Sequence, residues 1–144
     1  MPHTLRKKTT RPTGRPKSRM YRGIDLAVVR RNLEARWRKQ DQENIKRFSE
    51  ARRDARSIIG MIRKKYHPSR IYQWGSLLDK RTFNARSDID IAVEGITGAE
   101  TFFRLFGDAQ DMTALPLDIV QIEKIEPEFA DIIRLKGKVV YEKK

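Results

Sequence analysis

The residues best suited to carry chemistry are Asp88 and Asp90, which a single residue separates. On a strand, side chains two positions apart lie on the same face, with their Cα atoms roughly 6–7 Å apart. Two carboxylates held in this way repel each other unless a cation lies between them. Magnesium binds carboxylate oxygens together with the phosphate oxygens of a substrate. The pair therefore fits a magnesium site, although a solvated strand face also places acidic residues two apart.

A Gly-Ser pair, Gly75-Ser76, lies upstream, and its serine stands twelve residues before Asp88. Glycine permits a tight turn and a close approach of the backbone to a phosphate. The serine hydroxyl and the neighbouring amides donate hydrogen bonds to phosphate oxygens, above all where a helix begins. Alone the pair is ordinary turn chemistry. After one strand and before an Asp-x-Asp that opens the next, it favours a phosphate site.

A third acidic residue, Asp118, lies in the alternating apolar segment 117–122. Such an aspartate either faces solvent on an edge strand or is a functional carboxylate. If its strand neighbours the strand of Asp88 and Asp90, three carboxylates converge. One of them could then take the proton of an attacking hydroxyl or bridge the second metal of an in-line displacement.

The elements that must position these residues follow from the hydrophobic period. Strands are expected at 70–74, 88–94, 117–122 and 138–141, and helices at 98–110 and 128–135. This order predicts an α/β (α+β) fold in which helices flank a small mixed sheet. We assign that core to residues 68–144.

The segment before the core is expected to be helical over residues 23–67. Glycine and proline are absent from Ile24 to Ile59, and an apolar stripe recurs at spacings of three and four. The polar stretch 38–43 is either a turn between two helices or a solvated part of one helix. Residues 1–22 hold eight Lys/Arg, no acidic residue and three prolines, which predicts a disordered basic tail.

Composition narrows the classes of function. The chain has no cysteine, which excludes disulfides, thiolate zinc sites and cysteine nucleophiles. It has no apolar run long enough for a membrane span and no apolar core of a signal peptide, so a cytoplasmic protein is expected. Residues 1–74 carry 22 Lys/Arg against 6 Asp/Glu, and residues 75–144 carry 10 against 13. The basic half suits nucleic acid or an acidic partner protein.

Three segments resemble the nucleotidyltransferase superfamily of DNA polymerase beta, and most closely its minimal nucleotidyltransferase branch. They are residues 74–76 (Trp-Gly-Ser), 87–95 (Ser-Asp-Ile-Asp-Ile-Ala-Val-Glu-Gly) and 117–120 (Leu-Asp-Ile-Val). The resemblance extends over residues 70–142 and implies the nucleotidyltransferase fold. It implies that Gly75 and Ser76 bind a triphosphate, that Asp88 and Asp90 bind magnesium, and that Asp118 is the third carboxylate.

The loop between the two motifs departs from the family pattern. Many members carry an arginine soon after the Gly-Ser pair and a second glycine before the Asp-x-Asp, where this chain has residues 77–80 (Leu-Leu-Asp-Lys). Lys80, Arg81 and Arg86 either supply charge to the phosphates or are solvated loop cations. With Ser87 from the motif itself, Lys80 and Arg81 complete the predicted nucleotide-binding set.

The branch often provides the antitoxin of a toxin–antitoxin pair. The resemblance therefore implies transfer of AMP from ATP, with two magnesium ions, to a tyrosine of a helical HEPN-type toxin. Two alternatives remain: a catalytically idle module that neutralises a toxin or binds nucleic acid by contact, and transfer to a small molecule or RNA. The short chain leaves no room for an acceptor domain, so a partner, or a second copy bound through helix 24–66, would complete the site.

Overall fold

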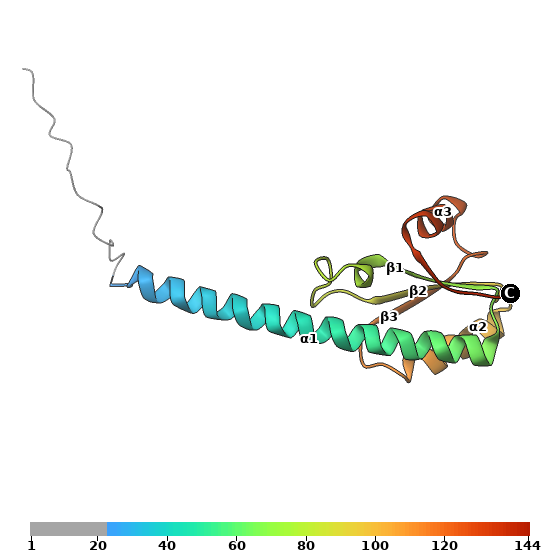
Figure 1. The fold of residues 1–144 in the computed structure, drawn as a ribbon, viewed down its shortest axis with the longest axis horizontal. Coiled ribbons are helices and arrows are strands. Elements are labelled where there is room, and N and C mark those ends of the chain that lie inside the picture. Colours follow the sequence, from blue (N-terminus) through green and yellow to red (C-terminus); the bar gives the residue numbers. More distant parts are fainter. Residues whose placement is uncertain (1–22) are drawn as a thin grey trace, which may run out of the picture. The chain divides into compact units, whose positions relative to one another are not determined.

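The computed structural model describes residues 23–144 of the chain (Figure 1). Its elements are α1 (Leu26–Tyr66), β1 (Arg70–Trp74), a 3-10 helix (Gly75–Leu78), β2 (Ile89–Glu94), α2 (Ala99–Gln110), β3 (Leu117–Gln121), α3 (Pro127–Lys136) and β4 (Lys138–Glu142). Their order confirms the prediction from the hydrophobic period. The basic tail predicted for residues 1–22 lies outside the described residues.

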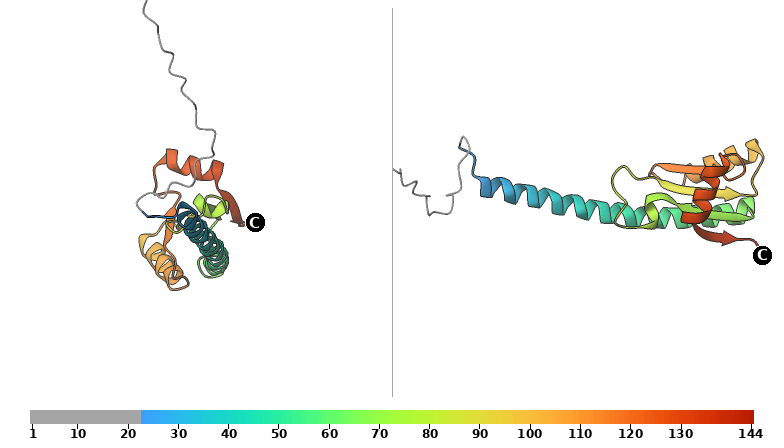
Figure 2. Two further views of the ribbon diagram at one scale, coloured as in Figure 1. Left: turned by 90° about the vertical axis from the view of Figure 1, so that its left-hand side faces the viewer. Right: turned by 90° about the horizontal axis from the view of Figure 1, so that it is seen from above.

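The four strands form one mixed sheet in the order β3-β2-β1-β4. Strands β2 and β3 are parallel, whereas β1 pairs antiparallel with both β2 and β4. The later turns of α1, together with α2, cover one face of this sheet, and α3 covers the other (Figures 1 and 2). The sheet is therefore buried on both faces, as expected when helices flank it.

Each face of the sheet has its own apolar core. The core on the side of α1 and α2 is the larger one and includes Ile58, Ile62, Ile71, Ile89, Ile91, Val93, Leu105 and Ile119. The core under α3 contains Tyr72, Ala92, Ile122, Ala130 and Ile133. Because successive side chains of a strand point to opposite faces, this division puts the side chains of Asp90 and Ala92 on the α3 face.

The chain from Leu26 to Tyr66 is one continuous helix, which decides between the two alternatives for the polar stretch 38–43. Arginine, lysine, glutamine and glutamate have high helix propensity, so a stretch without apolar residues does not interrupt the helix. The helix ends before Pro68, where His67 takes a positive φ of 51°. A residue that precedes proline is disfavoured in the α conformation.

Helix α1 contributes to two compact units, one ending at Lys39 and the other comprising Gln40–Lys144. In the second unit, four residues of α1 are buried in the core: Ala51, Ala55, Ile58 and Ile62. In the first unit, the apolar stripe is exposed at Leu26, Val29, Leu33 and Trp37. None of the helices in the described part of the chain has the length and apolarity required to cross a membrane.

Candidate active site

Asp90 lies in the middle of a row of residues that crosses the sheet on its α3 face. It is the register partner of Trp74 on β1 and of Asp118 on β3. Neighbouring strands are about 4.8 Å apart, so side chains at equivalent positions of one face are adjacent. The structure therefore confirms that the strand of Asp118 neighbours the strand of Asp90. The two carboxylates lie next to each other although they are 28 positions apart in the sequence.

The acidic residues create a region of uncompensated negative charge. Burial, together with the negative charges of Asp118 and Asp88, raises the pKa of Asp90 to about 7. Asp88 and Asp90 are half-buried, whereas Asp118 is exposed. Between residues 23 and 144, no three acidic or histidine side chains are placed closely enough to enclose a metal ion by themselves. The donor set still suits a divalent cation, because such an ion would offset the repulsion that raises the pKa of Asp90.

The turn that follows β1 is pressed against this row. Gly75 has a φ of 79°, in the left-handed region that glycine adopts at little cost. A Cβ built on Gly75 would clash with the carboxylate of Asp90. Both the conformation and the contact therefore require glycine here, and Ser76 is held close to the carboxylates because it directly follows this turn.

The loop between the two motifs is ordered by its own hydrogen bonds. Asp79 accepts a hydrogen bond from the backbone amide of Arg81 at 2.9 Å and pairs with its guanidinium at 3.2 Å. That guanidinium lowers the pKa of the Asp79 carboxyl. The Thr82 hydroxyl lies 2.9 Å from the carbonyl oxygen of Ser76, to which it donates. These contacts fix the path of the chain directly after the Gly-Ser pair.

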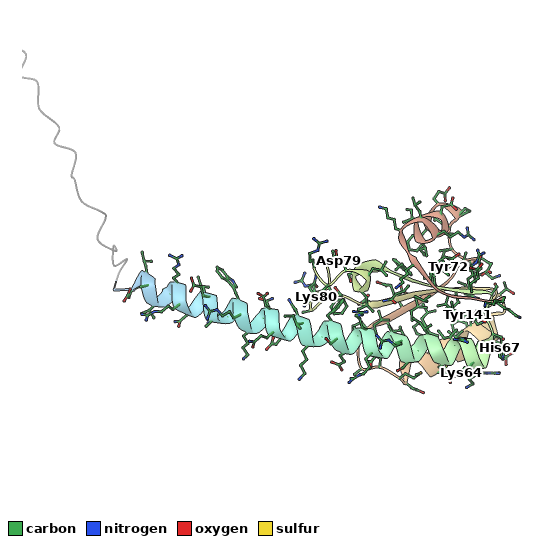
Figure 3. All side chains as sticks on the ribbon, in the orientation of Figure 1. Lys64, His67, Tyr72, Asp79, Lys80 and Tyr141 are labelled. Carbon is green, nitrogen blue, oxygen red and sulfur yellow. The ribbon has the colours of Figure 1, made fainter. Side chains whose placement is uncertain are left out.

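The predicted nucleotide-binding residues of this loop occupy two different environments. Ser87 closes the turn before β2, where its Oγ accepts a hydrogen bond from the backbone N–H of Asn84 at 2.9 Å. Lys80 and Arg81 line a separate cavity of about 290 Å³ with Asp41, Asn44, Ile45 and Phe83. Asp79 and Lys80 lie on the loop at the end of the sheet opposite to Tyr72 and Tyr141 (Figure 3). The structure thus brings Gly75, Asp90 and Asp118 together and sets Lys80 and Arg81 towards α1.

Sequence reasoning missed a cavity beside the carboxylates, to which Trp74 and α3 contribute. Trp74 ends the predicted strand 70–74 and belongs to the Gly-Ser motif. In the structure it lies next to Asp90 in the row and packs edge-to-face on Phe129, with 5.3 Å between ring centroids. The alternation of β1 places Trp74 on the face of Tyr72. The hydrophobic pattern of β1 does not indicate that α3 covers Trp74, because this contact joins segments that are far apart in the sequence.

Comparisons with known proteins agree with this geometry. The family described as Polymerase beta, Nucleotidyltransferase matches residues 56–144, which include every predicted site residue. No curated protein matches the chain. Among solved structures, the chain is similar to the toxin–antitoxin MntA-HepT, with 19% identity over 64% of this chain and 73% of that one and a TM-score of 0.50. It is also similar to a toxin–antitoxin with AMP-PNP, with 22% identity, coverages of 62% and 74% and a TM-score of 0.52.

Proposed function

We propose that this chain, which belongs to the Polymerase beta nucleotidyltransferase family, is a magnesium-dependent enzyme. In the proposed reaction it transfers AMP from ATP. The observation that supports this most strongly is the row on the α3 face: Asp90 is in register with Asp118 on one side and in contact range of the Gly75 turn on the other. Phosphate-binding backbone and metal-binding carboxylates thus adjoin in one place.

Each residue has a distinct role in the proposed reaction. The amides around Gly75 and the hydroxyl of Ser76 donate hydrogen bonds to the triphosphate, and Asp88 and Asp90 hold magnesium. When bound, magnesium neutralises the charge of the triphosphate and of the departing pyrophosphate. Asp118 takes the proton of the acceptor hydroxyl, since it is the exposed member of the three. The acceptor oxygen bonds to the α-phosphorus, and the bond from that phosphorus to pyrophosphate breaks.

The proposed acceptor is a tyrosine of a HEPN-type toxin, to which this chain acts as antitoxin. Two observations support a protein acceptor. Two solved structures that share the fold are described as toxin–antitoxin structures, one of them with AMP-PNP. In addition, Asp118 is exposed and lies on β3, which within residues 23–144 is an edge strand that pairs only with β2. An acceptor side chain presented by a partner can approach from that edge.

The experiment is incubation of the full chain with ATP labelled at the α-phosphate and magnesium, with and without the protein encoded by the neighbouring gene. We expect label on that partner. The variant Asp90→Asn should lower transfer at least about 100-fold, as removal of a charge-stabilising group does in other active sites. The matched control is Asp111→Asn, which changes an exposed aspartate at the end of α2 and should transfer normally.

Two results would overturn the proposal. If Asp90→Asn and the unaltered chain transfer label equally well, the carboxylates do not have the proposed role. If the partner binds but no label is transferred to any acceptor, the chain acts by contact, as the alternative of an idle nucleotidyltransferase fold predicts.

A further inference from the structure

A second cavity lies beside the carboxylate row, between α3 and the end of β1. Its volume is about 270 Å³, and its lining includes Trp74, Gly75, Phe129, Ile132 and Lys136. Pockets that enclose a whole drug-sized ligand measure roughly 300–1,000 Å³. This cavity is therefore suited to one ring system of a larger ligand whose remainder lies outside it.

The walls of the cavity are mostly apolar and include two aromatic rings. The indole of Trp74 meets the ring of Phe129 at an interplanar angle of 85°, a favourable edge-to-face arrangement. The Trp74 Nε1 atom is buried and has no hydrogen-bond partner among residues 23–144, so the indole is held there by packing. Ile132, which is 51% exposed, stands on the same helix as Phe129. Such walls favour a planar aromatic ring.

The lining contains one cation, Lys136, at the end of α3. Within residues 23–144, no carboxylate lies within 4.0 Å of its ammonium group. A lysine ammonium has only donors, so it suits the acceptor nitrogens or oxygens of a heteroaromatic ring. A purely hydrocarbon ligand would leave it unused.

The position of the cavity relative to the row decides which part of a nucleotide could enter it. Trp74 is adjacent to Asp90 on the side away from Asp118. Gly75 lines the cavity and is also the residue that packs against the Asp90 carboxylate. A ligand with its phosphates at Gly75 and Ser76 therefore has the cavity within reach. An acceptor approaching Asp118 lies on the other side of Asp90.

We propose that this cavity binds the base of the nucleoside triphosphate, with the ring against Trp74 and its acceptor atoms towards Lys136. The proposal rests on the proposed function, because it assumes that the phosphates bind at the Gly-Ser turn. An acceptor tyrosine is the less suitable occupant, because its oxygen must reach the α-phosphorus from the Asp118 side.

The test uses the full-length chain with two probes, ATP and inorganic tripolyphosphate, both with magnesium and both measured by calorimetry. The variant Ile132→Trp fills the cavity without adding charge. We expect it to weaken ATP binding about tenfold, within the range that stacking of one base on an aromatic side chain supplies, and to leave tripolyphosphate binding unchanged. The control is Leu135→Trp on the same helix, which is 83% exposed and outside the cavity lining.

A second measurement does not depend on a cavity variant. Trp37 and Trp74 are the two tryptophans of the chain, so Trp37→Phe leaves Trp74 as the single fluorescent reporter. ATP should change its emission, whereas tripolyphosphate should bind without doing so. If ATP binds, yet leaves the Trp74 emission unchanged and binds Ile132→Trp with unchanged affinity, the base lies elsewhere and the cavity proposal alone fails. If neither probe binds, the proposed function fails with it.

Discussion

Asp90 and Asp118 occupy equivalent register positions on the parallel strands β2 and β3, so their carboxylates are neighbours across the sheet. On the other side of Asp90, the Gly75 turn approaches so closely that a Cβ there would clash with the carboxylate. The acid is thus confined between a second charge and a backbone turn.

The raised pKa of Asp90 predicts how stability depends on pH. Its folded-state pKa of about 7 lies above the ordinary value of 3.8, so the folded state binds the proton more tightly than the unfolded state does. The contribution of Asp90 to stability is therefore present at low pH and is lost as pH rises from about 4 to 7. Thermal unfolding in chelator should show the unfolding temperature of the unaltered chain falling, relative to that of Asp90→Asn, as pH rises across this window.

Removal of a neighbouring charge provides the control for this pH dependence. Asp118→Asn should make the pH slope that Asp90 contributes shallower, because the charge of Asp118 is one cause of the raised pKa. Magnesium at neutral pH should raise the unfolding temperature of the unaltered chain more than that of either variant. A slope that is identical in all three proteins would mean that Asp90 titrates normally.

Gly75 and Gly107 form a matched pair of glycines. Gly75→Ala places a Cβ against Asp90 at a positive φ, and the left-handed conformation alone costs an alanine roughly 1–2 kcal/mol. We expect lower stability and loss of ATP binding. Gly107→Ala, inside α2 with open space around the added Cβ, should stabilise the chain by about 0.5–1 kcal/mol. Chemical denaturation and calorimetry measure both effects; a harmless Gly75→Ala would contradict the close approach.

Truncation of an apolar side chain of α1 to alanine should have different effects in the two units of the chain. Ile62 is fully buried under the sheet, so Ile62→Ala should cost about 2–5 kcal/mol of unfolding free energy. Leu33 is 40% exposed in the first unit, and Leu33→Ala should cost less than about 1 kcal/mol in the isolated chain. Urea denaturation monitored by circular dichroism compares the two. Equal losses would show that the first unit also packs in a core.

Substitution of the loop cations Lys80 and Arg81 should affect different properties, the KM for ATP in one case and the stability of the loop in the other. Arg81 is paired with Asp79, whereas no carboxylate in the described chain pairs with Lys80. Lys80 lines the cavity on the side of α1, and we expect its ammonium group, which a flexible four-carbon stem carries, to turn towards the phosphates when ATP binds. Lys80→Ala should then raise the KM for ATP about fivefold, consistent with about 1 kcal/mol for a solvated ion pair. Arg81→Ala should change KM less and disturb the loop more. Steady-state kinetics with thermal unfolding distinguishes these outcomes, and equal KM values for Lys80→Ala and the unaltered chain would exclude Lys80 from phosphate binding.

The sequence alone determined the local features of this protein. The alternation of residues 88–94 predicted the strand β2, with Asp90 opposite Ile89 and Ile91, because the side-chain period of a strand is fixed by backbone geometry. The strand itself begins at Ile89, so Asp88 directly precedes it. The Gly-Ser pair indicated a phosphate site, and the Asp-x-Asp spacing indicated a metal site, because residue types and short spacings are also local features of the sequence. Helix α1 was predictable, because propensity and the absence of glycine and proline act over neighbouring residues.

Only the tertiary structure decided which distant residues meet. The order β3-β2-β1-β4 and its register bring Asp118 beside Asp90, and no local pattern encodes pairing between strands that a helix separates. Apolar residues recur at helical spacing along α1, yet the residues of α1 that are buried in the core are Ala51, Ala55, Ile58 and Ile62. A helical period by itself does not distinguish a buried stripe from an exposed one. The cavity at Trp74 exists because α3 packs Phe129 and Ile132 over the end of β1. These two segments are far apart in the chain, and hydrophobic burial on the α3 face of the sheet stabilises their contact.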